Sequence, residues 1–274
     1  MLRQRLLVAV IGLPLGLAAV ILGGYFIFGA AVILTVLGLH EYYGLVRPYR
    51  PNLLVGYMSG LGVIVLSFFF DRYKPGGLSG QGGMLLAFAF MMTLIFFWSL
   101  LGKLGAHLVG RMALTALGVV WVGVGFAYIM LVRTLVHGLA LCILLVTCTV
   151  ANDTFAYFVG RVIGRHRMAP RISPKKTVEG ALGGLAGAVI AALLVSVYTN
   201  GMPKGYAALL GLVVGVFGQW GDLFESAVKR DFRVKDSGKI LPGHGGILDR
   251  FDSFLFASFA TYWGAIALLG EFVR

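Results

Sequence analysis

The stretch 206–225, YAALLGLVVGVFGQWGDLFE, runs directly into 226–252, SAVKRDFRVKDSGKILPGHGGILDRFD, and together they decide the fold of this chain. The first part is a mostly apolar run of about 20 residues, the length of helix that crosses a bilayer. The second part is rich in charged residues and glycine, and another apolar run follows it at 251–272. A polar segment between two such runs predicts a loop that joins two transmembrane helices at one membrane face.

The same alternation of apolar runs and short polar segments extends over the whole chain. Of its 274 residues 59% are hydrophobic and only 12% are charged, and the mean hydropathy is +0.90. The remaining apolar runs lie at 6–22, 24–40, 53–70, 84–102, 113–132, 135–159 and 181–199. Barrel strands would alternate in hydropathy over about ten residues, whereas these runs are continuous. We therefore predict an all-α polytopic membrane protein with nine transmembrane helices, whose boundaries are least defined near 102–113 and 132–135.

The distribution of basic residues predicts the orientation in the membrane. The chain carries 23 Lys and Arg against 11 Asp and Glu, a net charge of +12. In a soluble protein this excess would suggest a nucleic-acid partner, which we do not expect for a membrane protein. With the N-terminus in the cytoplasm, eighteen of the basic residues fall in cytoplasmic segments and five in external ones. This asymmetry follows the positive-inside rule and predicts a cytoplasmic N-terminus.

A basic loop at 160–180, GRVIGRHRMAPRISPKKTVEG, leads into the seventh predicted helix. Ser173 or Thr177 is suited to cap that helix, and Glu179 suits its first turn. A helix N-terminus attracts phosphate, and Lys175 and Lys176 would add positive charge for a polyphosphate. The alternative is a basic cytoplasmic loop with ordinary capping and no ligand.

Two carboxylates lie within or at the end of apolar runs, Asp153 in the sixth and Asp222 in the eighth. A charged side chain within a span costs at least about 2.5–3.5 kcal/mol on insertion scales, so a site or a buried partner must offset it. A polar contact between helices, or a helix end nearer the membrane surface, would also explain them. Asp222, Ser226 and Arg230 are four residues apart and share one face if the helix continues that far.

Asp249 and Asp252 lie at the start of the last predicted helix, where carboxylates are favoured. The two helix ends would bring Asp222 and Asp249 toward one cytoplasmic pocket. Oxygen ligands of this kind suit Mg²⁺, which binds one or two carboxylates together with substrate phosphates. The segment 242–246, PGHGG, is a flexible turn whose backbone N–H groups would suit an anion. These features predict a membrane enzyme that acts on phosphates and uses a divalent metal.

A longer pattern makes the prediction specific. It reads Ser226-x-Val228-Lys229-Arg230-x4-Lys235-Asp236-x-Gly238-x2-Leu241-Pro242-x-His244-Gly245-Gly246-Ile247-x-Asp249-Arg250-Phe251-Asp252. This pattern resembles the signature of the phosphatidate cytidylyltransferase (CDP-diglyceride synthase) family of bacterial type. The segments 152–153, 173–180 and 221–226 also resemble the family, and the similarity is dense over about 150–255. The first half of the chain is similar only as a hydrophobic multispan region.

The resemblance implies the reaction of CTP with phosphatidic acid to give CDP-diacylglycerol and pyrophosphate. It also implies a homodimer in the cytoplasmic (inner) membrane, with a polar cavity open to the cytoplasm and to the lipid bilayer. Family members use Mg²⁺ paired with a monovalent cation such as K⁺, at carboxylates that match Asp222 and Asp249.

Under this hypothesis, the site residues other than the metal ligands Asp222 and Asp249 divide into three groups. Basic side chains would hold phosphates, namely Lys175, Lys176, Lys229, Arg230 and Lys235. Asp236, His244 and Asp252 would orient the loop, the metal or a bound water. Further binding positions are predicted from the two loops and the intramembrane carboxylate: Asp153, Ser173, Thr177, Glu179, Ser226, Gly245, Gly246 and Arg250.

We predict that residues 1–132 form about five N-terminal transmembrane helices, and that these helices support packing and the dimer. Residues 133–274 form the catalytic region, with cytoplasmic loops at 160–180 and 226–250. Two other functions stay open on physical grounds. A CTP-dependent lipid kinase or phosphotransferase would use the same charges, and an ion-coupled transporter would explain the intramembrane carboxylates but not the basic, glycine-rich loop.

Overall fold

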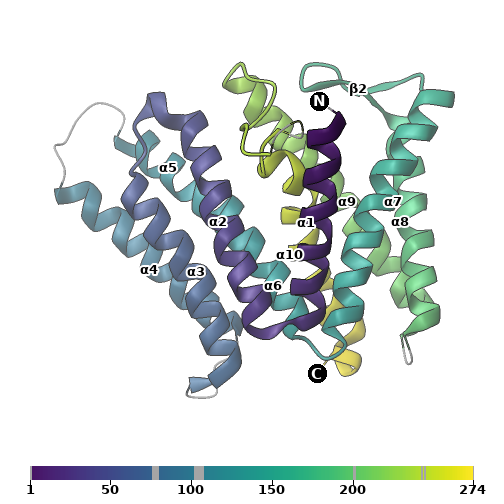
Figure 1. Cartoon of the computed structure of the whole chain (residues 1–274), viewed down its shortest axis with the longest axis horizontal. Helices are drawn as coiled ribbons and strands as arrows, with labels where there is room; N and C mark the ends of the chain where they lie inside the picture. The colour runs from purple at the N-terminus through teal and green to yellow at the C-terminus, as the bar shows by residue number, and fades with distance from the viewer. Residues whose placement is uncertain are drawn as a thin grey trace. The chain divides into compact units, whose positions relative to one another are not determined.

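The computed structural model describes residues 2–75, 80–101, 108–199, 202–241, 243 and 245–273, and these are almost entirely helical (Figure 1). The α-helices are α1 (Leu2–Leu22), α2 (Gly24–Val46), α3 (Leu53–Tyr73), α4 (Gly80–Leu101), α5 (Leu108–Gly118), α6 (Val124–Thr134), α7 (Gly138–Ile163), α8 (Val178–Tyr198), α9 (Lys204–Asp231) and α10 (Leu248–Val273). A π-helical turn, Val119–Gly123, joins α5 to α6, and a 3-10 turn, Arg47–Tyr49, follows α2.

The all-α membrane fold is confirmed. Within the described residues, eight helical segments are long and apolar enough to cross a membrane, and one of them is the continuous segment Leu108–Thr134 made of α5, the π-helical turn and α6. Each coincides with a predicted apolar run, and the 21-residue α1 occupies the position of the remaining run. The number of spans and the orientation of the N-terminus stay predictions.

The chain divides into two compact units. Unit 1 comprises Met1–Thr134 and Asp236–Arg250, and unit 2 comprises Leu135–Lys235 and Phe251–Arg274. In unit 1 the neighbouring helices α3 and α4 pack side by side (Figure 1). Tyr42 and Tyr43 of α2 donate hydrogen bonds to the carbonyl oxygens of Leu114 (3.0 Å) and Thr115 (2.9 Å), which ties α2 to α5. The segment 236–250 therefore groups with the N-terminal helices, although it lies far from them in sequence.

Helix packing in unit 2 depends on small residues. Helices α7 and α8 lie side by side along their length (Figure 1). A Cβ atom added at Gly184 of α8 would lie 2.7 Å from the carbonyl oxygen of Asn152 on α7, and one added at Gly211 of α9 would lie 2.9 Å from the carbonyl oxygen of Ala188 on α8. Small residues at a helix interface allow such close approach of the two backbones.

The loop predicted at 160–180 contains a short β-hairpin, which the sequence analysis did not predict. Strands β1 (Arg167–Ala169) and β2 (Ser173–Thr177) pair antiparallel, with Arg167 opposite Thr177 and Ala169 opposite Ser173. Helix α9 extends to Asp231, beyond the predicted apolar run. Asp222, Ser226 and Arg230 therefore do share a helix face, as their spacing predicted, and the basic residues Lys229 and Arg230 fall in the last turn, where positive charge is favoured.

Candidate active site

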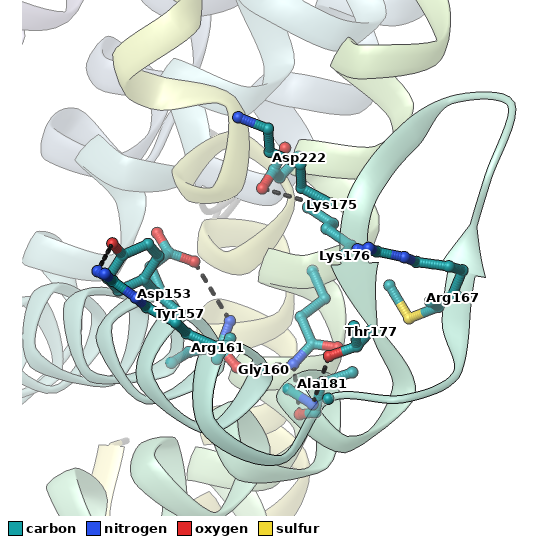
Figure 2. Close-up of a pocket in the computed structure, with 16 residues that line it drawn as sticks. Asp153, Tyr157, Gly160, Arg161, Arg167, Lys175, Lys176, Thr177, Ala181 and Asp222 are labelled. Atoms are coloured by element: carbon teal, nitrogen blue, oxygen red, sulfur yellow. Dashed lines mark hydrogen bonds and ion pairs between the residues drawn. The ribbon is translucent and has the colours of Figure 1, made fainter.

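A cavity of about 670 Å³ lies in unit 2 between α7, β2, α8 and α9 (Figure 2). Its lining is polar and charged where these elements meet, and it consists of Asn152, Asp153, Ala156, Tyr157, Gly160, Arg161, Gly164, Arg167, Met168, Lys175, Lys176, Thr177, Gly180, Ala181, Gln219 and Asp222. Asp153, Lys175, Lys176, Thr177 and Asp222 were predicted site residues, and the structure brings these five together in one cavity.

Positive charge in the cavity comes from three elements. Arg161 of α7 and Arg167 of β1 join Lys175 and Lys176 of β2, so four basic side chains face two carboxylates, Asp153 and Asp222. Asp153, Tyr157 and Arg161 are four residues apart along α7 and lie on one helix face, as Figure 2 shows. Arg161 donates a hydrogen bond from Nη1 to the Tyr157 hydroxyl at 2.9 Å. The lining thus has the charges to hold more than one phosphate group.

Asp222 is the cavity carboxylate that contacts a basic side chain. The Lys176 ammonium lies 2.5 Å from Asp222 Oδ2, with about a quarter to a third of each side chain exposed to solvent. The Ser226 hydroxyl donates to the other oxygen, Oδ1, at 3.3 Å. Asp222 therefore has one cationic and one neutral partner, and its carboxylate is held at the cavity wall in a defined orientation.

The start of α8 is built by Thr177 rather than Ser173. The Thr177 hydroxyl accepts a hydrogen bond from the Gly180 N–H at 3.1 Å and caps the helix, while Ser173 lies in β2 opposite Ala169. Glu179, in the first turn, accepts backbone hydrogen bonds from Arg165 (3.0 Å) and His166 (3.2 Å). Its carboxylate fixes the backbone just before β1, the strand that carries Arg167 into the cavity.

Two amide side chains line the cavity and were missed as site residues. Gln219 Nε2 donates to Asn152 Oδ1 and to the Ala181 carbonyl oxygen, both at 2.9 Å, and links α9 to α7 and α8. Asn152 Nδ2 lies 3.5 Å from Asp153 Oδ1. A glutamine within an apolar helix was the available sequence signal. Arg161 and Arg167 were visible only as general basic charge, because sequence does not show which side chains of a loop turn inward.

A second group of charges lies between α9 and α10. Lys229 Nζ is 2.8 Å from Glu225 Oε2, and Glu225 is almost fully buried. Asp252, at the start of α10, is close enough to Asp222 for their charges to interact, and Asp222 and Asp153 interact in the same way. Asp153, Asp222 and Asp252 therefore form one electrostatically interacting group in unit 2, and of these Asp153 and Asp222 line the cavity.

This donor set can be tested against the expected Mg²⁺. Among the described residues no group of three or more His, Cys, Asp or Glu side chains forms a preformed metal site. Mg²⁺ does not need such a group, because it retains waters and binds through one or two carboxylates plus substrate phosphates. The hard oxygens of Asp222, next to a cavity lined by phosphate-binding cations, fit that requirement.

The glycine-rich loop of unit 1 is fixed by Asp249. Its Oδ2 accepts hydrogen bonds from Ser237 N (2.9 Å), Ser237 Oγ (3.0 Å) and Gly246 N (2.7 Å). Gly245 adopts φ +86°, a conformation that favours glycine, and pairs with Leu241 across the turn. Asp249 thus holds both ends of the loop. It belongs to unit 1 and Asp222 to unit 2, so their predicted pairing at a metal stays a prediction.

The remaining predicted residues have different surroundings. Arg230 donates from Nε to the Ile172 carbonyl oxygen at 3.2 Å, which links α9 to the hairpin. Lys235, Asp236 and Arg250 are exposed. His244 lies outside the described residues.

Comparisons with known proteins agree with this chemistry. A model of the cytidylyltransferase family matches residues 3–267. The chain is 34% identical to a phosphatidate cytidylyltransferase of Synechocystis sp., over 97% of both chains. It is 35% identical to the protein of the same name from Bacillus subtilis, over 93% of this chain and 94% of that one. A Staphylococcus aureus phosphatidate cytidylyltransferase is also 35% identical, over 93% of this chain and 95% of its own. The chain therefore belongs to the cytidylyltransferase family, whose members are nucleotidyltransferases.

Proposed function

We propose that the protein catalyses the reaction of CTP with phosphatidic acid to give CDP-diacylglycerol and pyrophosphate, a step of phospholipid biosynthesis. The observation that carries this proposal is the cavity of unit 2, where four basic side chains face Asp153 and Asp222 between membrane-spanning helices. The similarity to phosphatidate cytidylyltransferases and the signature at 226–252 support the same substrate pair.

The roles of the residues follow from the charges of the reactants. CTP and phosphatidic acid are both anions, so their approach requires neutralisation of phosphate charge. Lys175, Lys176, Arg161 and Arg167 would supply that neutralisation. A phosphatidate oxygen would attack the α-phosphorus of CTP in line as pyrophosphate leaves. The lipid phosphate is already ionised at neutral pH, so the step needs no strong general base.

The proposed metal is Mg²⁺, with a monovalent cation such as K⁺ as its neighbour. Asp222 and Asp249 would hold it, and when bound it would neutralise phosphate charge beyond what the basic side chains supply. The contacts of Asp222 with Lys176 and Ser226 would hold its carboxylate in position for the metal. Asp153 and Asp252, which interact electrostatically with Asp222, would add negative charge that favours a cation near Asp222.

We further propose a homodimer in the cytoplasmic membrane, with the site at the cytoplasmic face, where CTP is available. The charge asymmetry of the loops supports this orientation. It can be tested with single introduced cysteines, because the native Cys142 and Cys148 are both buried. A cysteine at Arg171 should react with an impermeant maleimide only from the cytoplasmic side, and one at Lys204 only from the opposite side. The reverse pattern would refute the orientation.

The activity is tested with purified protein in detergent, CTP and phosphatidic acid, with and without Mg²⁺. We expect equal amounts of pyrophosphate and CDP-lipid, and loss of both when Mg²⁺ is removed with EDTA. A lipid kinase would instead release CDP and a phosphorylated lipid. A transporter would release no pyrophosphate at all, and either of these results would refute the proposal.

A further inference from the structure

We propose that Glu41 of α2 is a positioning residue that anchors the glycine-rich loop 236–249 for catalysis. The inference rests on the proposed function, since that loop carries most of the signature. Glu41 comes from the half of the chain whose sequence suggested only hydrophobic spans, and nothing in the signature points to it.

The Glu41 carboxylate contacts residues near both ends of the loop. Its Oε1 accepts a hydrogen bond from the Ile247 N–H at 2.9 Å, and its Oε2 accepts one from the Leu248 N–H at 2.9 Å. The Ser237 hydroxyl lies 3.4 Å from the same Oε2. Glu41 is 4% exposed, so these bonds are shielded from water. One buried carboxylate therefore binds the loop at its beginning and at its end.

The backbone of the loop is built around this carboxylate. A Cβ atom added at Gly238 or Gly246 would collide with the carboxylate group of Glu41. Both glycines are positions of the signature, and their close approach to Glu41 gives a physical reason why a larger side chain would not fit there. The loop thus requires both the absence of side chains at these positions and the presence of the carboxylate.

Ser237 connects Glu41 to Asp249, which is a predicted metal ligand. Ser237 lies between the two carboxylates, and its hydroxyl is 3.0 Å from Asp249 Oδ2. Glu41 and Asp249 consequently hold the same short segment from opposite sides. Glu41 also accepts two N–H groups at the start of α10, where a negative charge interacts favourably with the helix dipole. Loss of Glu41 would release the start of α10 and the loop together.

A carboxylate, rather than any polar group of this size, is required by the number of donors. Each oxygen of Glu41 accepts one backbone N–H group, and Oε2 also lies 3.4 Å from the Ser237 hydroxyl, whose single proton it shares with Asp249 Oδ2. Glutamine keeps one accepting oxygen, but its NH₂ group would face a buried N–H, and an unsatisfied buried donor is costly. Glu41→Gln is therefore nearly isosteric and should still detach the loop. Misplacement of a catalytic group by about 1 Å can lower a rate by about 100-fold.

The experiment compares Glu41→Gln and Ser237→Ala with the wild type and with Tyr43→Phe. Tyr43 is on the same helix and loses one buried hydrogen bond, to the Thr115 carbonyl oxygen, away from the loop. Hydrogen exchange of the full-length protein is followed by mass spectrometry on peptides covering 236–250. Steady-state kcat and KM for CTP and the apparent Tm are measured on the same samples.

We expect Glu41→Gln to accelerate exchange in 236–250 and to lower kcat by about 100-fold, with KM for CTP changed less than about threefold, because the basic side chains of the cavity are intact. Ser237→Ala, which loses one donor, should have a smaller effect of the same kind even if Glu41→Gln does not fold. Tyr43→Phe should keep kcat near that of the wild type.

Unchanged exchange in 236–250 for both loop variants would overturn the proposal, and so would accelerated exchange with a normal kcat. An equal loss of kcat in Tyr43→Phe would also overturn it, because the effect would then be general destabilisation. Exchange requires no substrate, so it distinguishes the two hypotheses: a wild-type protein that forms no CDP-lipid contradicts the proposed function, and the exchange result alone then decides whether Glu41 anchors the loop.

Discussion

Replacement of Lys176 by methionine tests the cavity most directly. The Lys176 ammonium is 2.5 Å from Asp222 Oδ2, and its side chain is 26% exposed. A hydrogen bond to a charged group contributes about 1.5–3 kcal/mol net. If Lys176 contacts a phosphate in the transition state, the variant loses one such bond there. Because about 1.4 kcal/mol corresponds to a factor of ten, Lys176→Met should lower kcat/KM for CTP by about 10- to 150-fold.

The assay is pyrophosphate release at saturating phosphatidic acid with CTP varied, and a matched control is available in the same unit. Lys204 is exposed at the start of α9, about 27 Å along the helix from Asp222. Lys204→Met should keep kcat/KM within about twofold of the wild type, since surface substitutions away from special features have small effects. A normal kcat/KM in Lys176→Met, or an equal loss in Lys204→Met, would refute the reasoning.

The affinity for CTP, which can be measured without turnover, separates the two possible roles of Lys176 when Lys176→Met is combined with Asp222→Asn. If Lys176 acts only by holding Asp222, the two substitutions should be strongly non-additive, because residues in one ion pair share their effect. If Lys176 binds a phosphate independently, the losses in free energy should add.

Three further predictions follow from the same structure. Asp222→Asn should abolish CTP-dependent pyrophosphate release while the protein elutes as the wild type in size-exclusion chromatography; near-normal turnover would contradict its role as a metal ligand. Thr177→Ala removes the N-cap of α8 and should lower stability by about 1 kcal/mol, measured as a lower apparent Tm, whereas an unchanged Tm would show that the cap contributes little. Gly184→Leu would force a side chain against the Asn152 carbonyl and should destabilise unit 2 by at least about 1–3 kcal/mol, while Gly205→Ala, which has open space, should be tolerated. Equal Tm values for the last two variants would contradict the packing argument.

The parts of the fold that the sequence predicted well depend on local pattern. A continuous apolar run must form a helix in lipid, because its backbone hydrogen bonds have no other partner, and so the positions of the spans followed from hydropathy alone. The shared face of Asp222 and Ser226 followed equally from helix periodicity once α9 was known to continue. The hairpin β1–β2 was missed because a short polar segment shows no comparable periodicity.

The residues of the candidate site were likewise predicted only in part from the sequence. The sequence by itself determined that this is a polytopic membrane protein of the cytidylyltransferase type, and it identified Lys175, Lys176 and Asp222 from charge and signature. Only the tertiary structure showed that Arg161, Arg167 and Gln219 complete the cavity, and that Glu41 binds a loop about 200 residues further along the chain. The physical reason is that hydropathy and helical period act between near neighbours. A buried carboxylate, by contrast, is defined by donors that the folded chain brings to it from a distant segment.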